Sequence, residues 1–418
     1  MTDSVSAVTY GVSMRVLHTS DWHLGRTFHG VDLLDDQRRG LSAIASVAAA
    51  ESVDVVVVAG DIYDRSVPSA DAVEVYDAGL AEIAATGAQI IITSGNHDSA
   101  TRLGAGSSFA AAGGLHLRTS LSAIDEPVIL SDDHGEVAFY GVPYLEPDTT
   151  RRALGIDTPC GHQGVLSAAM ERIRADLATR NARSVVAAHA FVVGAAPTGS
   201  ERSISVGGVE TVAAETFSGV DYVALGHLHS PQEVSPSVRY SGSPLAYSFG
   251  ERTHRKAVWI VDLDADGLAD VRRHDLPVVR ELSSLRGSLD ELLAEAEYTA
   301  AESHYVEATL TDAVRPVDAM RRLRERFPHA VHVEWERPEA ACALDYRSRV
   351  RGRTDEEIIA SFISDVRDEP TRTERELFEH ALKVVRGEPE VTAAGADDGE
   401  LALFTIQEEP PAADAKSA

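Results

Sequence analysis

VDVVVVAGDIYD, residues 53–64, is the most informative stretch of this 418-residue chain, because four consecutive valines lead through Ala-Gly directly into an aspartate. A run that is apolar at every position is typical of a strand buried on both faces, as in the centre of an α/β protein. Gly60 allows a sharp turn after the strand, which places the carboxylate of Asp61 at the strand end. A lone Gly-Asp pair is more often an ordinary turn, so its meaning depends on what accompanies it.

The pattern recurs on both sides of this stretch. Over the first two-thirds of the chain, short β-branched runs alternate with alanine-rich amphipathic stretches. Such alternation is typical of an α/β fold. We expect strands at residues 15–19, 53–59, 89–93, 137–142, 184–188 and 221–225, and helices at 34–51, 69–85 and 163–179.

Histidines, acids and an asparagine follow these expected strands in a fixed order. They are Asp21 and His23, Asp61, Asn96 with His97 and Asp98, His189, and finally His227 and His229. Any single histidine among sixteen is more often a surface or hydrogen-bonded residue than a ligand, but the ordered set favours a site. Loops at strand ends usually carry the active site of an α/β protein. Carboxylates, an amide oxygen and imidazoles are what two divalent metals need for phosphate ester hydrolysis.

The spacing within the segments predicts part of the geometry. Asp21 and His23 stand two positions apart, so a turn would bring both side chains to one ion. Asp61, freed by the preceding glycine, is placed to bridge two ions. His227 and His229 project in the same direction if the segment between them is extended.

The composition fits a cytoplasmic protein without a membrane span. The hydrophobic fraction is 44%, yet no run approaches the roughly 20 apolar residues that a transmembrane helix needs. No basic stretch followed by an apolar one, as in a secretory signal, stands near the beginning. Only Cys160 and Cys342 are present, which excludes a disulfide framework and fits a reducing compartment.

The formal net charge of −28 argues against nucleic-acid binding over the whole surface. It does not exclude DNA as a substrate. Bound metals would place positive charge where a phosphodiester must lie, and a partner could supply further contacts.

A different pattern begins after about residue 278. A strand at 305–310, a helix at 317–327 and a strand at 331–335 predict a small α+β domain. Residues 354–368 and 371–386 then form two helices, each with one apolar stripe. These helices predict a docking surface for another protein, although packing on their own domain remains the alternative. Residues 387–418 are acidic and rich in alanine and proline, and we expect a disordered tail.

The ordered segments resemble the calcineurin-like metallophosphoesterases, and most closely the SbcD-type nuclease subunits of bacterial SbcCD complexes. The most similar stretches are 17–25, LHTSDWHLG; 60–65, GDIYDR; 95–99, GNHDS; 226–229, GHLH; and 241–245, SGSPL. The resemblance implies a β-sandwich flanked by helices over residues 14–275 and a capping domain over 276–345. It also implies that helices in 346–386 dock an SbcC-type ATPase.

Residue roles follow from the same resemblance. One metal is expected to bind Asp21, His23, Asp61 and His229, and the other Asp61, Asn96, His189 and His227. Both are expected to be manganese, with zinc or iron as alternatives. His97 would lie outside the ligand shells and protonate the leaving oxygen or stabilise its charge. Asp98 would either orient His97 or brace the loop.

The resemblance implies a DNA nuclease that acts as a 3′–5′ exonuclease on double strands and as an endonuclease on single strands and hairpins. It would serve repair, recombination and replication as a homodimer within a heterotetramer. The chain has no Gly-x-x-x-x-Gly-Lys-Ser/Thr loop, so the ATPase partner would handle ATP. Alternatives are a phosphatase, a cyclic-nucleotide phosphodiesterase and a scaffold without activity. Arg26, Arg65 and Arg102 would contact DNA phosphates or remain solvated surface residues.

Overall fold

A computed structural model describes residues 13–198, 200–201, 211–336, 350–366 and 369–386. The chain divides between Glu336 and Arg337 into two compact units. The expected tail at 387–418 lies outside the described residues. Within the described ranges, no helix is long and apolar enough to cross a membrane.

The first unit contains two six-stranded sheets. The first sheet has the order β14-β13-β1-β4-β5-β6, with β1, β4, β5 and β6 parallel and β13 and β14 antiparallel. Its strands are β1 (Met14–Thr19), β4 (Val55–Ala59), β5 (Gln89–Thr93), β6 (Leu115–Leu117), β13 (Ala257–Asp264) and β14 (Gly267–Asp275). The valine run is therefore an interior strand, as predicted.

The second sheet has the order β11-β12-β10-β9-β8-β7, with antiparallel strands at both edges. Its strands are β7 (Val128–Asp132), β8 (Gly135–Val142), β9 (Ala182–His189), β10 (Tyr222–Gly226), β11 (Gln232–Ser235) and β12 (Val238–Tyr240). The four interior strands are parallel, so their carboxyl ends meet at one edge.

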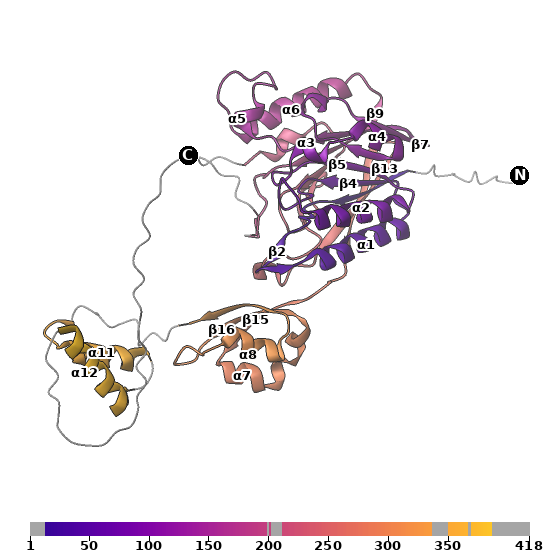
Figure 1. Cartoon of the computed structure of the whole chain (residues 1–418). Helices are drawn as coiled ribbons and strands as arrows, with labels where there is room; N and C mark the ends of the chain where they lie inside the picture. The colour runs from indigo at the N-terminus through magenta and orange to yellow at the C-terminus, as the bar shows by residue number, and fades with distance from the viewer. Residues whose placement is uncertain (1–12, 199, 202–210, 337–349, 367–368, 387–418) are drawn as a thin grey trace, which may run out of the picture. The chain divides into compact units, whose positions relative to one another are not determined.

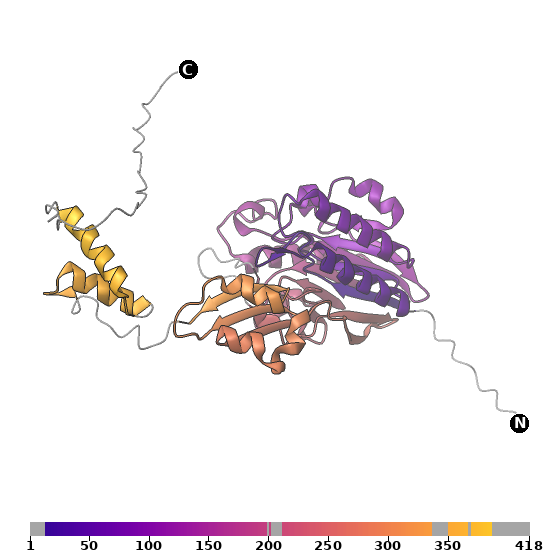
Figure 2. The same ribbon diagram turned by 60° about the horizontal axis from the view of Figure 1, so that its bottom comes forward.

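Helices cover the outer faces of the two sheets. The three long ones are α1 (Leu34–Ala50), α2 (Ala70–Ala84) and α6 (His162–Leu177). In Figure 1, α1 and α2 lie together on one side of the strands and α6 lies on the other, and Figure 2 shows the sandwich from a second direction. Short helices lie in the connections: α3 (Ala100–Leu103), α4 (Ser107–Ala110), η1 (Ala111–Gly113), η2 (Leu121–Ala123), α5 (Pro147–Thr150), η3 (Ala214–Phe217) and η4 (Phe249–Glu251).

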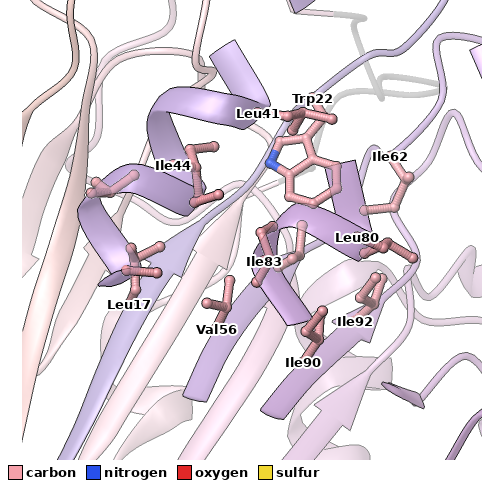
Figure 3. Packing of buried hydrophobic residues seen from close by; sticks show 14 of the residues in the cluster. Leu17, Trp22, Leu41, Ile44, Val56, Ile62, Leu80, Ile83, Ile90 and Ile92 are labelled. Carbon is pink, nitrogen blue, oxygen red and sulfur yellow. The ribbon is translucent and has the colours of Figure 1, made fainter. Parts of the chain in front are cut away.

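The valine run is apolar at every position because β4 has a core on each face. Val55 and Val57 pack between the two sheets, whereas Val56 and Val58 pack beneath α1 and α2. Figure 3 shows this second cluster, in which Trp22 lies among leucines and isoleucines of the sheet and both helices. Side chains alternate across a strand, so burial on both faces requires an apolar residue at each position.

A third sheet of parallel strands, in the order β15-β16-β17, follows the sandwich. Its elements are β15 (Leu282–Gly287), α7 (Leu289–Ala294), η5 (Ala296–Ser303), β16 (Tyr305–Leu310), α8 (Ala319–Arg326) and β17 (Ala330–Trp335). This small domain has its own apolar core. It contacts the sandwich where the Tyr305 hydroxyl donates to Asp36 Oδ2 at 2.9 Å and the Tyr305 ring meets Phe28 in the hairpin of β2 (Thr27–Phe28) and β3 (Val31–Asp32).

The second unit contains a pair of helices, α11 (Asp355–Val366) and α12 (Arg372–Arg386). Arg386 at the end of α12 forms ion pairs with Asp355 and Glu356 at the start of α11. Phe362 and Leu377 remain exposed in spite of this pairing. An apolar surface is therefore left on the pair.

The α/β class and every element expected from the sequence are confirmed, with most boundaries within two residues. Additional strands at the sheet edges, such as β7 and β14, were not expected. Their residues are partly exposed and mixed in polarity, so they carry a weaker pattern than the buried interior strands. The domain limits at 275 and 345 remain predictions.

Candidate metal centre

The candidate ligands come from loops that follow parallel strands of both sheets. Asp21 and His23 follow β1, Asp61 follows β4, Asn96 follows β5, His189 ends β9, and His227 and His229 follow β10. All except Asn96 are buried. The sandwich therefore gathers residues separated by more than 200 positions along the chain.

The backbone is strained at several of these residues. Asp21, His23, Asp61 and His227 have φ angles of 54°, 45°, 51° and 111°. They are four of the seven non-glycine residues with positive φ in the described part of the chain. Each such conformation costs on the order of 1–3 kcal/mol and persists mainly where function requires a particular side-chain direction. The backbone bends at His227, so the condition under which His227 and His229 would project in the same direction is not met.

One group of ligand atoms joins Asp21, His23 and His229. These atoms all lie within 4.8 Å of one another. The Nε2 atoms of His23 and His229 are 3.1 Å apart. Two nitrogens that bind one ion at about 2.1 Å and at roughly right angles are separated by about 3 Å. The spacing therefore fits two adjacent ligands of a common ion.

A second group forms around His189. Asn96 Oδ1 lies 2.9 Å from His189 Nε2, and Asp61 Oδ2 lies 3.5 Å from the same nitrogen. The same Asp61 oxygen is 3.5 Å from His23 Nε2, so this carboxylate lies between the two groups. His227 joins by ring contact, with its centroid 5.3 Å from that of His189. His227 and His229 thus serve different groups.

Burial controls the charge of most of these imidazoles. It lowers the pKa of His23 and His229 well below the usual range and lowers that of His227 to about 4. These rings are therefore neutral, which is the form that binds metal. The Nδ1 of His189 lies 3.0 Å from the carbonyl oxygen of Ala59, and this arrangement leaves Nε2 to face the site.

Asp21, Asp61 and His189 shift one another's pKa values. Burial acts to raise the pKa of Asp61, but the neighbouring histidines, first His189 and then His23 and His97, outweigh it and hold this pKa well below the usual range. Burial acts to lower the pKa of His189, but Asp61 outweighs it and raises the pKa to about 9. Burial raises the pKa of Asp21 to about 7.

The residues present fit divalent metal ions. Two buried carboxyl groups, four imidazoles and an amide oxygen supply the mixed oxygen and nitrogen donors that such ions bind. The Nδ1 atom of His23 is buried without a hydrogen-bond partner among the described residues. Such concentration of buried ionisable groups is costly unless positive charge compensates it.

His97 lies beside the ligands, and one of its ring nitrogens is within 4.8 Å of the ligand atoms of His23 and Asp61. Its ring meets that of His23 edge to face, with centroids 4.6 Å apart. Its Nδ1 lies 2.8 Å from the carbonyl oxygen of Asp64, and its backbone N–H donates to Asp61 Oδ1 at 2.9 Å. With Nδ1 occupied in this way, Nε2 is left for other partners.

Asp98 contacts backbone amides. Its Oδ1 accepts from Tyr63 N–H at 2.9 Å, and its Oδ2 accepts from Ile62 N–H at 3.1 Å and Gly95 N–H at 2.9 Å. The carboxylate thus joins the loop after β4 to the loop after β5. These contacts correspond to the bracing alternative.

Of the three candidate arginines, Arg26 lies at the site. Its guanidinium donates to Ser200 O at 2.8 Å and lies 4.8 Å from the ring centroid of Tyr247. The side chain of Arg65 is 81% exposed, and that of Arg102 is exposed near Ser66.

Several contacts to the ligands were not predicted from the sequence. The hydroxyl of Ser20 donates to Asp21 Oδ2 at 2.5 Å and lies 2.7 Å from the Ser241 hydroxyl. The ring of Tyr247 lies against those of His23 and His229. The stretch 241–245 was among those that resemble the family, but its residues carry no ligand pattern of their own.

Comparison with known proteins agrees with this geometry. The family described as calcineurin-like phosphoesterase matches residues 14–231, and the type 5 capsule protein repressor C-terminal domain matches residues 278–367. The chain is 28% identical over 378 residues to the SbcD component of the nuclease SbcCD from Staphylococcus epidermidis, covering 89% of this chain and 99% of that protein.

Two solved structures are similar to part of the chain at 13% identity. They are TT1561 of Thermus thermophilus, with 64% of this chain and 100% of that chain covered, and a dimetal phosphatase from Danio rerio, with 63% and 99% covered. Both have a TM-score of 0.39. The first family match spans more than half of the 418 residues and contains every candidate ligand, so the chain belongs to the calcineurin-like phosphoesterases.

Proposed function

We propose that this protein is the nuclease subunit of an SbcCD-type complex and cuts DNA with two divalent metal ions. It acts as a 3′–5′ exonuclease on double strands and as an endonuclease on single strands and hairpins. The observation that carries the proposal is the pair of ligand groups sharing Asp61, with His97 directly beside them. Similarity to the staphylococcal SbcCD nuclease component over most of the chain supports DNA as the substrate.

The ligand groups divide the metals between them. Asp21, His23, Asp61 and His229 would hold one ion, and Asp61, Asn96, His189 and His227 would hold the other. When bound, such ions supply Lewis-acid activation of water and neutralise charge on phosphate oxygens. Manganese suits the mixed donors.

His97 acts on the leaving group in this proposal. Its Nδ1–H donates to the carbonyl oxygen of Asp64, which leaves Nε2 free to face the substrate. In the imidazolium form Nε2 also carries a proton, and this proton would pass to the leaving sugar oxygen. Asp98 holds the loop that carries His97 against the loop that carries Asp61, because its carboxylate accepts hydrogen bonds from backbone N–H groups of both loops. Arg26, held over Tyr247, is the arginine placed to bind a phosphate.

A basic surface supports a long substrate such as DNA. A hollow of about 830 Å³ is lined by His254, Arg255, Arg273 and His274, together with Ser230 and with Asp275, which forms an ion pair with Arg273. Ser230 directly follows a candidate ligand. The hollow also lies at the sheet edge that carries the site, since β13 begins there and β14 ends there. On a chain with a net charge of −28, such a cluster fits a phosphate backbone.

Helices α11 and α12 would dock the SbcC-type ATPase through their exposed apolar residues. Two copies of the chain would join two copies of that partner. The complex would work in the cytoplasm, in the repair, recombination and replication of DNA.

The test compares substrates and one variant. Purified protein with Mn²⁺ is incubated with duplex DNA labelled at either end, with a hairpin, with a cyclic nucleotide and with p-nitrophenyl phosphate. We expect shortening from 3′ ends and cutting of the hairpin. His97→Ala should retain Mn²⁺ and lose at least about 100-fold in cleavage rate.

Two results would contradict this proposal. Turnover of only the small substrates would favour the phosphatase or cyclic-nucleotide phosphodiesterase alternative. Binding of Mn²⁺ without hydrolysis of any substrate, even with an SbcC-type ATPase and ATP present, would favour an inactive scaffold.

A further inference from the structure

A chain of buried and partly buried polar groups contacts Nδ1 of His229, the nitrogen that does not face His23. The Nδ1 of His229 lies 2.6 Å from the Ser200 hydroxyl oxygen, and that hydroxyl donates to Glu251 Oε1. The second oxygen of Glu251 accepts from Lys256 Nζ at 2.5 Å. Glu251 is completely buried and Lys256 nearly so. Ser200, Glu251 and Lys256 all lie outside the candidate ligand set.

The direction of these hydrogen bonds follows from what each group can donate. Glu251, paired with the Lys256 ammonium, is a carboxylate and has no hydrogen to give. The Ser200 hydroxyl must therefore donate to Glu251, and its oxygen can only accept from His229 Nδ1–H. A neutral imidazole protonated at Nδ1 carries its lone pair on Nε2. This is the nitrogen that lies 3.1 Å from His23 Nε2.

The backbone of His229 is held by the same network. Its carbonyl oxygen accepts from Lys256 Nζ at 2.7 Å, while Lys256 also donates to Ser243 Oγ at 3.0 Å. On the other side, the N–H of His229 donates to Glu201 Oε1 at 3.1 Å. Lys256 therefore binds both the Glu251 carboxylate, which orients the His229 ring through Ser200, and the backbone carbonyl of His229 itself.

His189 provides a comparison within the same site. Its Nδ1 faces a backbone carbonyl, so the nitrogen that points away from the site is held by the main chain and not by a side chain. A buried ion pair contributes little to stability on its own, because the cost of removing two charges from water offsets their attraction. The pair of Glu251 and Lys256 therefore calls for a role other than stability, and its contacts lead to His229.

We propose that Ser200 and Glu251 are positioning residues for the metal ion held by Asp21, His23 and His229, with Lys256 holding Glu251 in place. The inference rests on the proposed two-metal function of this site. Partners that orient a ligand histidine typically contribute about 10–100-fold to metal affinity. The loss should fall on one ion, because the network contacts only one ligand group.

Titration with Mn²⁺, followed by electron paramagnetic resonance of the free ion and by calorimetry, tests this inference. We expect two binding steps in the wild type. Ser200→Ala should weaken one step by about 10–100-fold and leave the other unchanged, while Ser200→Thr retains the hydroxyl and both steps. Glu251→Gln should weaken the same step. Ser184→Ala is the matched control, since the Ser184 hydroxyl also donates to a carboxylate, that of Asp221, at 2.8 Å outside the site.

The metal-free unfolding temperature of Ser200→Ala should equal that of the wild type, and this separates positioning from folding. If Ser200→Ala binds Mn²⁺ with unchanged affinity, the inference is overturned. The proposed function still stands in that case, provided that the wild type shows two binding steps. Equal weakening of both steps would also overturn it, because a general disturbance acts on both groups. Absence of Mn²⁺ binding by the wild type would overturn the inference and the proposed function together.

Discussion

Single residues in this site have properties that neighbouring sequence does not indicate. Asp61 illustrates this, because the largest cause that lowers its pKa is His189, which lies 128 positions later and 3.5 Å away. Gly95 is a second case, since a Cβ at this position would collide with Asp61 Oδ1. The carboxylate thus fills the space that a larger residue would occupy. The surroundings of the Asp61 carboxylate therefore determine its charge and also require a glycine at position 95.

Metal binding should depend steeply on pH. In the metal-free protein the pKa of His189 is about 9 and that of Asp21 about 7, and both groups must lose their protons to bind an ion. Between pH 7 and 8 one proton is released, so affinity should rise about tenfold, and between pH 6 and 7 the rise should be steeper. Calorimetry with Mn²⁺ in buffers of different ionisation enthalpy measures both affinity and released protons. Affinity that stays constant over this range would contradict the coupling of Asp61 to His189.

At the scale of elements, the carboxyl ends of strands from both sheets lie together, and this brings the candidate metal ligands into one site. The ligands follow β1, β4, β5, β9 and β10, which are interior strands. The basic hollow uses the antiparallel strands β13 and β14 instead. Because β13 runs opposite to β1, its first residues lie at the edge where β1 ends. Parallel strands thus position the metals, and the antiparallel hairpin adds a surface beside them.

Replacing Arg255 by glutamate should weaken DNA binding without altering the metal centre. The change reverses one charge in the hollow, so we expect about tenfold weaker binding of duplex DNA and a shallower dependence on salt. Fluorescence anisotropy in EDTA measures binding, and Mn²⁺-dependent hydrolysis of bis-p-nitrophenyl phosphate should remain at the wild-type rate. Arg38→Glu, an exposed arginine of α1, is the control. Equal DNA affinity in both variants would remove the hollow from the proposed DNA path.

At the scale of the whole molecule, several large apolar side chains are left uncovered. In the first unit, Phe109 is 86% exposed, Val67 is 64% exposed and Val73 is 42% exposed. The residue before Val67 is hydrogen-bonded to α3, because Arg102 donates to the carbonyl oxygen of Ser66. Phe109 lies in α4, the next helix after α3. Exposed apolar residues on neighbouring segments often mark contact with another chain. This surface therefore suits the proposed homodimer.

Phe109→Asp should shift the protein toward the monomer. Placing a charge in a buried contact between copies should weaken self-association at least about tenfold, or about 1.4 kcal/mol. Sedimentation velocity over a range of concentrations measures the equilibrium. Val314→Asp, in the small domain, is the control and should associate like the wild type. If Phe109→Asp remains dimeric at every concentration that keeps the wild type dimeric, the interface lies elsewhere.

The sequence by itself determined the α/β class, the main strands and helices, and the residues that end the strands. These features depend on local patterns, such as the valine run before Gly60 and Asp61, which record burial on each face of one element. Only the tertiary structure decided that Asp61 lies between two ligand groups, that the chain turns at His227, and that Ser200 and Glu251 stand behind His229. Each of these depends on contacts between distant segments, and a hydroxyl or carboxylate that meets a ligand only after folding has no local pattern to indicate its partner.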